Sequence, residues 1–305
     1  MSWRLLLFGS LVLLHPGVSS AGPYAPAGGQ PGATAILATD RSIVEWASGA
    51  TINRGLAEID NPSLGYATYG GPNGSGTSAN TAPIGSPPQP QSTYYAVALG
   101  QGGTATLTFA QPITNGPGYD FAVFGNGFSE GSQEWCKPAF VEVSSDGANF
   151  FPFPSVSLTQ TTTQVGSFGT LDPTNLYDLA GKDPVGYGTP FDLQELAGVS
   201  PLLNINDVTE VRIVDCVGDI NPAYATYDSQ GHIINAPWPA TATAGSEGFC
   251  LAGVGVINAV PEPSTLALLV SAGLAAGIAF RRRASRRPAD RDCQQPAPAS
   301  NSAVC

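Results

Sequence analysis

Histidine, methionine and basic side chains are scarce in this chain of 305 residues, which holds two histidines, one methionine and twelve lysines and arginines. Within residues 22–259 the only histidine is His232. A zinc site built on several histidines is therefore excluded, and a Ser-His-Asp triad would depend on this one side chain. The chain also lacks a Cys-x-x-Cys pair, a Gly-x-Ser-x-Gly elbow and a glycine loop that would bind phosphate ahead of a helix.

Positive charge is especially rare in the middle of the chain. Residues 22–259 carry twenty acidic side chains against five basic ones, a formal charge of −15; the five are Arg41, Arg54, Lys137, Lys182 and Arg212. Such a surface repels nucleic acid and anionic lipid, so no nucleic-acid partner is expected. The same carboxylates would tolerate or recruit divalent cations.

Long helix-forming stretches are missing as well, while Gly, Pro, Ser, Thr and Asn are abundant. This composition is typical of an all-β secreted domain, and we expect a single β-sandwich with long loops over residues 40–258. Residues 22–39 are expected to form a linker, and Asn61 to Gln91 a long surface loop. The predicted strands are Ile43–Trp46, Thr104–Phe109, Tyr119–Phe124, Phe140–Ser144, Phe150–Phe153, a segment centred on Val211–Val214, and Cys250–Asn258.

The amino end has the features of a secretory signal peptide. Arg4 precedes the apolar stretch Leu5 to Leu14, and Ser19-Ser20-Ala21 offers small residues for cleavage. Residues 1–21 are therefore predicted to direct export through the Sec translocon and to be removed.

The carboxyl end combines three elements in a fixed order. Pro261-Glu262-Pro263 is followed by an apolar run from Thr265 to Phe280 and then by Arg281, Arg282 and Arg283. As a helix the run would be roughly 24 Å long, which suits one membrane span, and the arginines would stay on the cytoplasmic side. A plain membrane anchor that is not processed is the alternative interpretation.

This arrangement resembles the PEP-CTERM sorting signal of Gram-negative bacterial surface proteins. The resemblance implies that residues 259–283 are read by a membrane-embedded exosortase, with passage through the inner membrane and delivery to the cell surface or extracellular matrix. Residues 284–305 would then be a disordered cytoplasmic tail.

A second resemblance concerns the middle of the chain. The hairpin-like segment Val141–Phe150 contains Ser145-Asp146-Gly147 followed by an aromatic residue, and is similar to a hairpin of galactose-binding-like, discoidin-type jelly rolls. Val208–Asp215 and the final strand fit the last two strands of such a fold. The resemblance implies a jelly-roll form of the sandwich.

Two kinds of ligand site are candidates. Oxygen-bearing side chains that follow predicted strands could converge on calcium if these strand ends share one pole: Asn126, Glu134, Asp215, Asp219 and Asp228. Aromatic side chains in loop-like segments near Asp and Asn could bind a sugar ring: Trp135, Trp238 and Tyr187, with Phe191 nearby. The simpler interpretations are solvated loop acids and turn caps for the first set, and aromatics that cap the core for the second.

The cysteine count is odd in the exported part, which holds Cys136, Cys216 and Cys250. One disulfide is expected in an oxidising compartment, and the preferred pair is Cys216–Cys250, with Cys136 as the open alternative.

Together these features predict an exported, non-enzymatic protein of the cell surface or biofilm matrix, active in glycan binding or calcium-dependent adhesion, with extracellular polysaccharide as a partner. A hydrolase of polysaccharide that uses a carboxylate pair is one alternative. A matrix component without a discrete ligand is the other.

Overall fold

The computed structural model describes residues 21–68, 96–239 and 248–261. The chain divides into two units, Met1–Val260 and Pro261–Cys305, and the fold below is that of the first. The predicted leader, most of the predicted 61–91 loop and the predicted membrane span lie outside the described residues. In the part of the chain that is described, no helix is long and apolar enough to cross a membrane.

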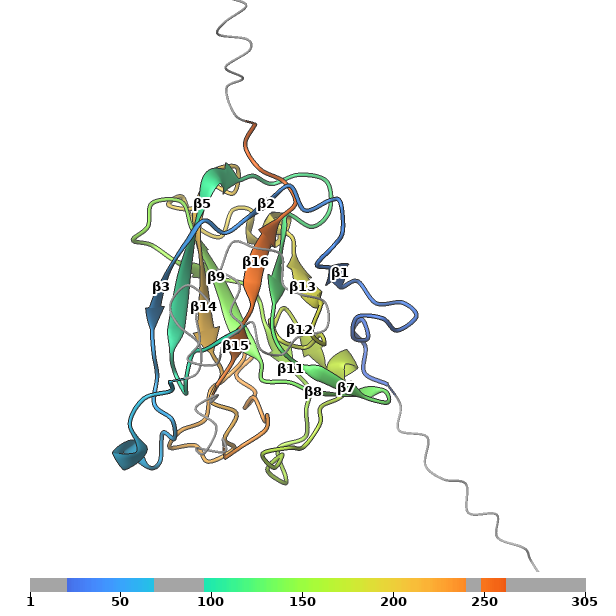
Figure 1. The fold of residues 1–305 in the computed structure, drawn as a ribbon, viewed down its shortest axis with the longest axis vertical. Helices are drawn as coiled ribbons and strands as arrows, with labels where there is room; N and C mark the ends of the chain where they lie inside the picture. Colours follow the sequence, from blue (N-terminus) through green and yellow to red (C-terminus); the bar gives the residue numbers. More distant parts are fainter. Residues whose placement is uncertain (1–20, 69–95, 240–247, 262–305) are drawn as a thin grey trace, which may run out of the picture. The chain divides into compact units, whose positions relative to one another are not determined.

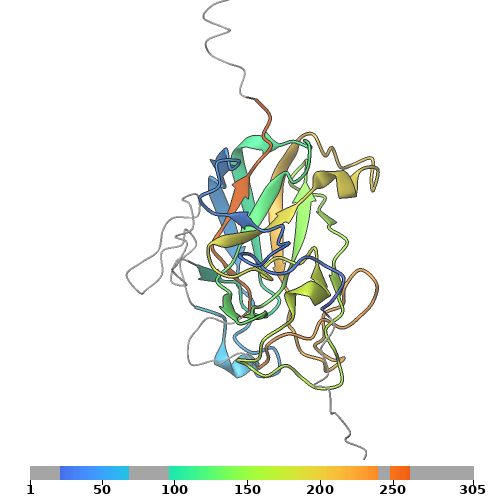
Figure 2. The ribbon, with the colours of Figure 1, turned by 90° about the vertical axis from the view of Figure 1, so that its right-hand side faces the viewer.

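Two five-stranded antiparallel sheets make up the body (Figure 1, Figure 2). The first sheet has the order β1 (Ile36–Leu37), β13 (Tyr187–Phe191), β6 (Phe121–Phe124), β16 (Gly253–Val256), β2 (Glu45–Trp46). The second has the order β10 (Phe151–Pro152), β9 (Ala139–Ser144), β14 (Val208–Asp215), β5 (Thr104–Ile113), β3 (Gly49–Asn53). The all-β prediction is confirmed.

Short elements complete the body. Three two-stranded sheets pair β4 (Val97–Ala98) with β15 (Cys250–Leu251), β7 (Phe128–Glu130) with β8 (Gln133–Trp135), and β11 (Val156–Ser157) with β12 (Leu176–Tyr177). Three 3₁₀ turns are described: η1 (Pro62–Leu64), η2 (Pro173–Asn175) and η3 (Leu193–Leu196).

The main core lies between the two large sheets. One apolar cluster contains Phe121 and Val254 from the first sheet together with Leu107, Val141 and Val211 from the second, all at most 1% exposed. In β5 the predicted alternation holds, since Ala105 and Leu107 are buried while their neighbours are more exposed. The body is thus a β-sandwich.

Strand β6 is buried on both of its faces, as its continuous apolar sequence predicts. Phe121 and Val123 belong to the main core, whereas Ala122 and Phe124 pack on the other face with Ala38 and neighbours. Strand β6 therefore needs a second apolar layer, and the residues before β2 supply it.

The segment predicted as a linker is part of the folded body. Within residues 22–39, β1 pairs with β13 in the register Ile36↔Gly188, and Ala27 and Ala38 are buried. The composition of this segment suggested a spacer because its few apolar side chains have no period. Its backbone hydrogen bonds, rather than a pattern of side chains, attach it to the body.

Candidate functional site

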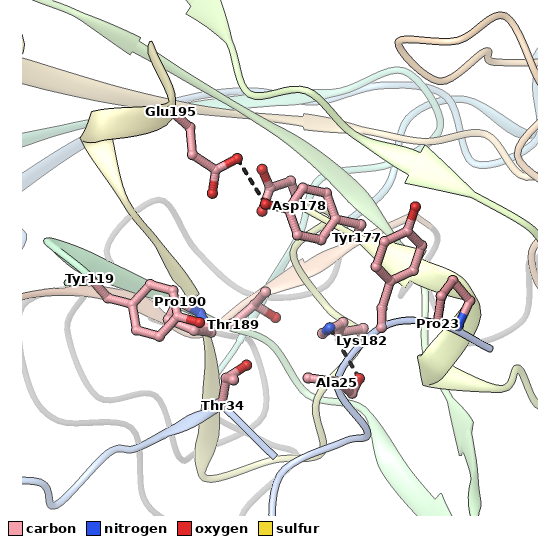
Figure 3. A pocket seen from close by; sticks show the side chains of 11 residues that line it. Pro23, Ala25, Thr34, Tyr119, Tyr177, Asp178, Lys182, Thr189, Pro190 and Glu195 are labelled. Carbon is pink, nitrogen blue, oxygen red and sulfur yellow. Dashed lines mark hydrogen bonds between the residues drawn. The ribbon is translucent and has the colours of Figure 1, made fainter. Parts of the chain in front are cut away.

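A cavity of about 280 Å³ lies where the N-terminal segment meets β12, β13 and η3 (Figure 3). Its volume is near the lower end of the roughly 300–1,000 Å³ typical of small-molecule sites, so it suits a ligand of about one ring. Eleven residues line it: Pro23, Tyr24, Ala25, Thr34, Tyr119, Tyr177, Asp178, Lys182, Thr189, Pro190 and Glu195. We refer to it as the tyrosine cavity.

Three tyrosines give the cavity its apolar surface. Tyr177 ends β12, and its ring stacks on Tyr24 with centroids 5.1 Å apart and planes at 30°. Tyr119 enters from the residues before β6 and is 36% exposed. Tyrosine rings combine an apolar face with a polar tip, so these walls can contact both the face and the hydroxyl groups of a ligand.

A pair of carboxyl groups forms the polar side of the cavity. Asp178 follows β12 with the backbone at φ 45°, a left-handed conformation that aspartate adopts more readily than most residues. Its carboxyl group is hydrogen-bonded to that of Glu195 in η3 (Figure 3). Glu195 also accepts a hydrogen bond from the Tyr177 hydroxyl, with 2.9 Å between Oη and Oε2.

The carboxyl group of Asp178 is harder to ionise than an exposed one. Burial raises the pKa of Asp178 to about 8, and the charge and hydrogen bond of Glu195 add to the rise. Asp178 therefore keeps a proton near neutral pH that it can donate within the pair.

Lys182 supplies a buried amine on the opposite side. Its Nζ donates to the carbonyl oxygens of Ala25, at 3.4 Å, and Leu176, at 3.2 Å. Burial lowers the pKa of Lys182, and the adjacent carboxyls of Asp183 and Asp178 act in the opposite direction. The amine therefore lies in the cavity wall with two backbone acceptors and two carboxyl groups nearby.

The N-terminal segment closes one side of the cavity through its backbone. Tyr24 N donates to Thr174 O, and Gly28 N donates to the buried Asp183 carboxylate at 2.9 Å. Asp183 also accepts from the Thr189 hydroxyl on β13. The positions of Tyr24 and Ala25 are thus fixed by bonds to residues about 150 positions away.

Four of the five residues predicted to bind calcium have separate hydrogen-bond partners. Asp215 accepts from Phe249 N and Gly102 N, Asp219 accepts from Asn221 N, and Asp228 accepts from Ser157 N and His232 N. Glu134 accepts from the Ser129 hydroxyl, and Asn126 is half-buried after β6.

Among the described residues, no group of three or more His, Cys, Asp or Glu is placed to hold a metal ion. The predicted convergence is therefore not found there.

The aromatic side chains predicted to bind a sugar lie in two places. The Trp135 indole stacks on Phe128, with centroids 5.0 Å apart, and donates to Ser167 O, while Trp238 N donates to Val165 O. The two tryptophans thus contact the same segment. Tyr187 is elsewhere, with its ring packed directly under Gly28, so its face is covered.

The predicted Cys216–Cys250 disulfide is not formed. Cys216 is a free, buried cysteine in a cluster with Leu171 and Ile234, whereas Cys250 packs in a different cluster with Ala98. The Cys250 sulfur lies 3.9 Å from Gly248 O. Cys136 is also free, and burial raises the pKa of its thiol.

None of the residues of the tyrosine cavity was predicted to form a site. They come from four separate stretches of the sequence and have no common spacing. One signal was available, because Lys182 is one of only five basic residues in the acidic body, and a buried lysine needs partners.

Comparison with known proteins bears on the carboxyl end. Residues 259–283 match the PEP-CTERM protein-sorting motif. The motif indicates an exported surface protein that an exosortase sorts, with membrane anchoring through the C-terminal segment. Pro261 is described and exposed, and the remaining residues of the motif core, Glu262, Pro263 and Arg281–Arg283, lie outside the described residues. No curated protein matches the chain.

Proposed function

We propose that this PEP-CTERM protein is a non-enzymatic, carbohydrate-binding protein of the cell surface or extracellular matrix, and that the tyrosine cavity is its binding site. The observation that carries the proposal is the combination, in one ring-sized cavity, of tyrosine faces with a hydrogen-bonded carboxyl pair and a buried amine.

The contacts suit a pyranose ring in two ways. The face of Tyr119 or Tyr177 can lie against the C–H groups of the sugar, as aromatic faces do in carbohydrate sites. The carboxyl oxygens of Glu195 and Asp178 can accept hydrogen bonds from sugar hydroxyls. A site with fixed buried polar groups discriminates against analogues that lack the matching hydroxyl.

The test is a glycan array followed by calorimetry on the chain from Gly22 to Cys305 in mild detergent. Tyr177→Ala should weaken binding of the best glycan about tenfold or more, because it removes a wall and a hydrogen bond to Glu195. Trp135→Ala is the matched control at the other aromatic site. If Trp135→Ala abolishes binding and Tyr177→Ala does not, the site lies at the Trp135 and Trp238 surface and our assignment is wrong.

A polysaccharide hydrolase is the second candidate, and the Asp178–Glu195 pair is the observation in its favour. Asp178 has a raised pKa, as the general acid of a glycosidase does. Against it, the two groups bond to each other, whereas a retaining pair flanks the glycosidic bond at about 5 Å. Release of reducing sugar that is lost in Glu195→Gln would establish the hydrolase.

The galactose-binding-like jelly roll stays part of the proposal. The hairpin that carried this resemblance is present, since Asp146 accepts from Ala148 N and Asn149 N between β9 and β10. A calcium-dependent adhesin is tested by melting the chain with calcium and with EDTA. A matrix component without a ligand predicts no glycan and no calcium effect.

A further inference from the structure

The first residues after the predicted leader are attached to the body at a specific point. Gly22 N donates to the Thr174 hydroxyl oxygen at 2.6 Å, and the Thr174 hydroxyl in turn donates to Asp172 Oδ1 at 2.6 Å. Asp172 also accepts from Thr174 N at the start of η2. We call Thr174 and Asp172 the anchor.

The anchor fits glycine closely. A Cβ at position 22 would come within 2.2 Å of Thr174 O and 2.4 Å of the Asn175 side chain. Such contacts cannot be accepted without moving backbone, so a larger residue would displace the segment. The residue that fits this position is also the first residue after Ser19-Ser20-Ala21, the predicted cleavage site.

We propose that removal of the leader strengthens the binding site, because the new amino terminus at Gly22 carries a charge on the anchor and holds the N-terminal wall of the tyrosine cavity more firmly in place. In this step a leader peptidase hydrolyses the Ala21–Gly22 bond. Water supplies the hydroxyl of the Ala21 carboxylate, which leaves with the leader, and the nitrogen of Gly22 becomes a protonated amine.

The charge change strengthens contacts that already exist. Before cleavage, Gly22 N is an amide with one proton for Thr174. After cleavage it is an ammonium group next to the hydrogen-bonded chain that ends at the Asp172 carboxylate. Hydrogen bonds with a charged donor are roughly twice as strong as neutral ones.

The anchor is directly connected to the cavity. The three residues that follow Gly22 line the cavity: Pro23, Tyr24 and Ala25. The Tyr24 ring stacks on Tyr177. The carbonyl oxygen of Ala25 accepts a hydrogen bond from Lys182 Nζ (Figure 3). If residues 22–25 leave the body, the cavity loses a wall and Lys182 loses one of its two acceptors. This inference rests on the proposed function only for the identity of the ligand.

The test compares the chain Gly22–Cys305 with three altered forms of the same chain, all in mild detergent. One keeps Ser19-Ser20-Ala21 ahead of Gly22, one has an acetylated Gly22 that retains the N–H but not the charge, and one carries Gly22→Ala. Gly166→Ala is the matched control, because a Cβ there meets nothing within 4 Å. The readouts are hydrogen exchange at Tyr24 N–H and affinity for the glycan identified above.

We expect exchange at Tyr24 to be roughly threefold to tenfold faster in the extended, acetylated and Gly22→Ala chains than in the free Gly22 chain, with glycan affinity reduced in parallel. Gly166→Ala should match the parent. Equal exchange in the extended and free chains would overturn the proposal. If no glycan binds but exchange still depends on the free amine, the docking is upheld and the proposed function fails.

Discussion

Asp215 and Asp178 are both buried aspartates at the end of a strand, yet their carboxyl groups have different surroundings. Asp215 ends β14 and accepts from two backbone N–H groups, those of Phe249 and Gly102. Asp178 follows β12, bonds to a second carboxyl group and faces a cavity. Burial alone therefore does not distinguish the two acids, whereas their hydrogen-bond partners do.

The difference between the two aspartates should be largest in the free energy of unfolding that each contributes. Asp215→Ala leaves two N–H groups in the interior without an acceptor, and each unsatisfied buried donor costs about 1–3 kcal/mol. We therefore expect the free energy of unfolding to fall by about 3 kcal/mol, measured by urea denaturation of the chain Gly22–Cys305. Asp178→Ala is the comparison and should cost clearly less, since it breaks no bond to backbone. Equal losses would remove the distinction between the two acids.

The second largest expected effect is the change in the free energy of unfolding with pH. Asp178, with a pKa of about 8, and Asp215, raised by burial to about 7, bind protons more tightly when folded than when unfolded. Their stabilising contribution is complete below about pH 4 and is lost as the pH rises through 7 and 8. The free energy of unfolding should thus fall between pH 5 and pH 9 by an amount on the order of 2 kcal/mol, and the melting temperature should fall with it. A flat or rising profile over this range would contradict the assignment.

The smallest expected effect is that of replacing Asp178 by asparagine. Asp178→Asn should change the free energy of unfolding near pH 4 by about 0.5 kcal/mol or less, because an amide can donate to Glu195 as the protonated acid does. The same variant should reduce the loss of stability between pH 4 and pH 8. Chemical denaturation at the two pH values provides the measurement, and an unchanged pH profile would show that Asp178 does not titrate there.

The sandwich could be predicted where one strand carries its own signal. Strand β5 alternates, β6 is continuously apolar, and the Asp146–Gly147 turn marks the β9–β10 hairpin, so the sequence patterns were sufficient. Strand β13 was missed because Gly188 and Pro190 interrupt its pattern, although it lies between β1 and β6. Its place in the sheet comes from partners that are distant in sequence.

The cavity could not be predicted for the same reason. Tyr24 and Tyr177 meet across more than 150 positions, and the backbone bonds that hold residues 22–28 depend on Thr174 and Asp183. The cysteine pairing failed on similar grounds, since Cys216 follows β14 and Cys250 begins the next strand, β15, but the two side chains enter separate apolar clusters. Composition predicted the class of fold and the terminal motifs predicted the destination of the chain, whereas the site depends on three-dimensional contacts.

The position of β16 has a consequence for the order in which the body can be completed. This strand, Gly253–Val256, pairs with both β6 and β2 in the interior of the first sheet, although it is nearly the last part of the body in the sequence. Without β16 the first sheet is divided between β6 and β2, so a chain made from its amino end can complete this sheet only when its last strand is present.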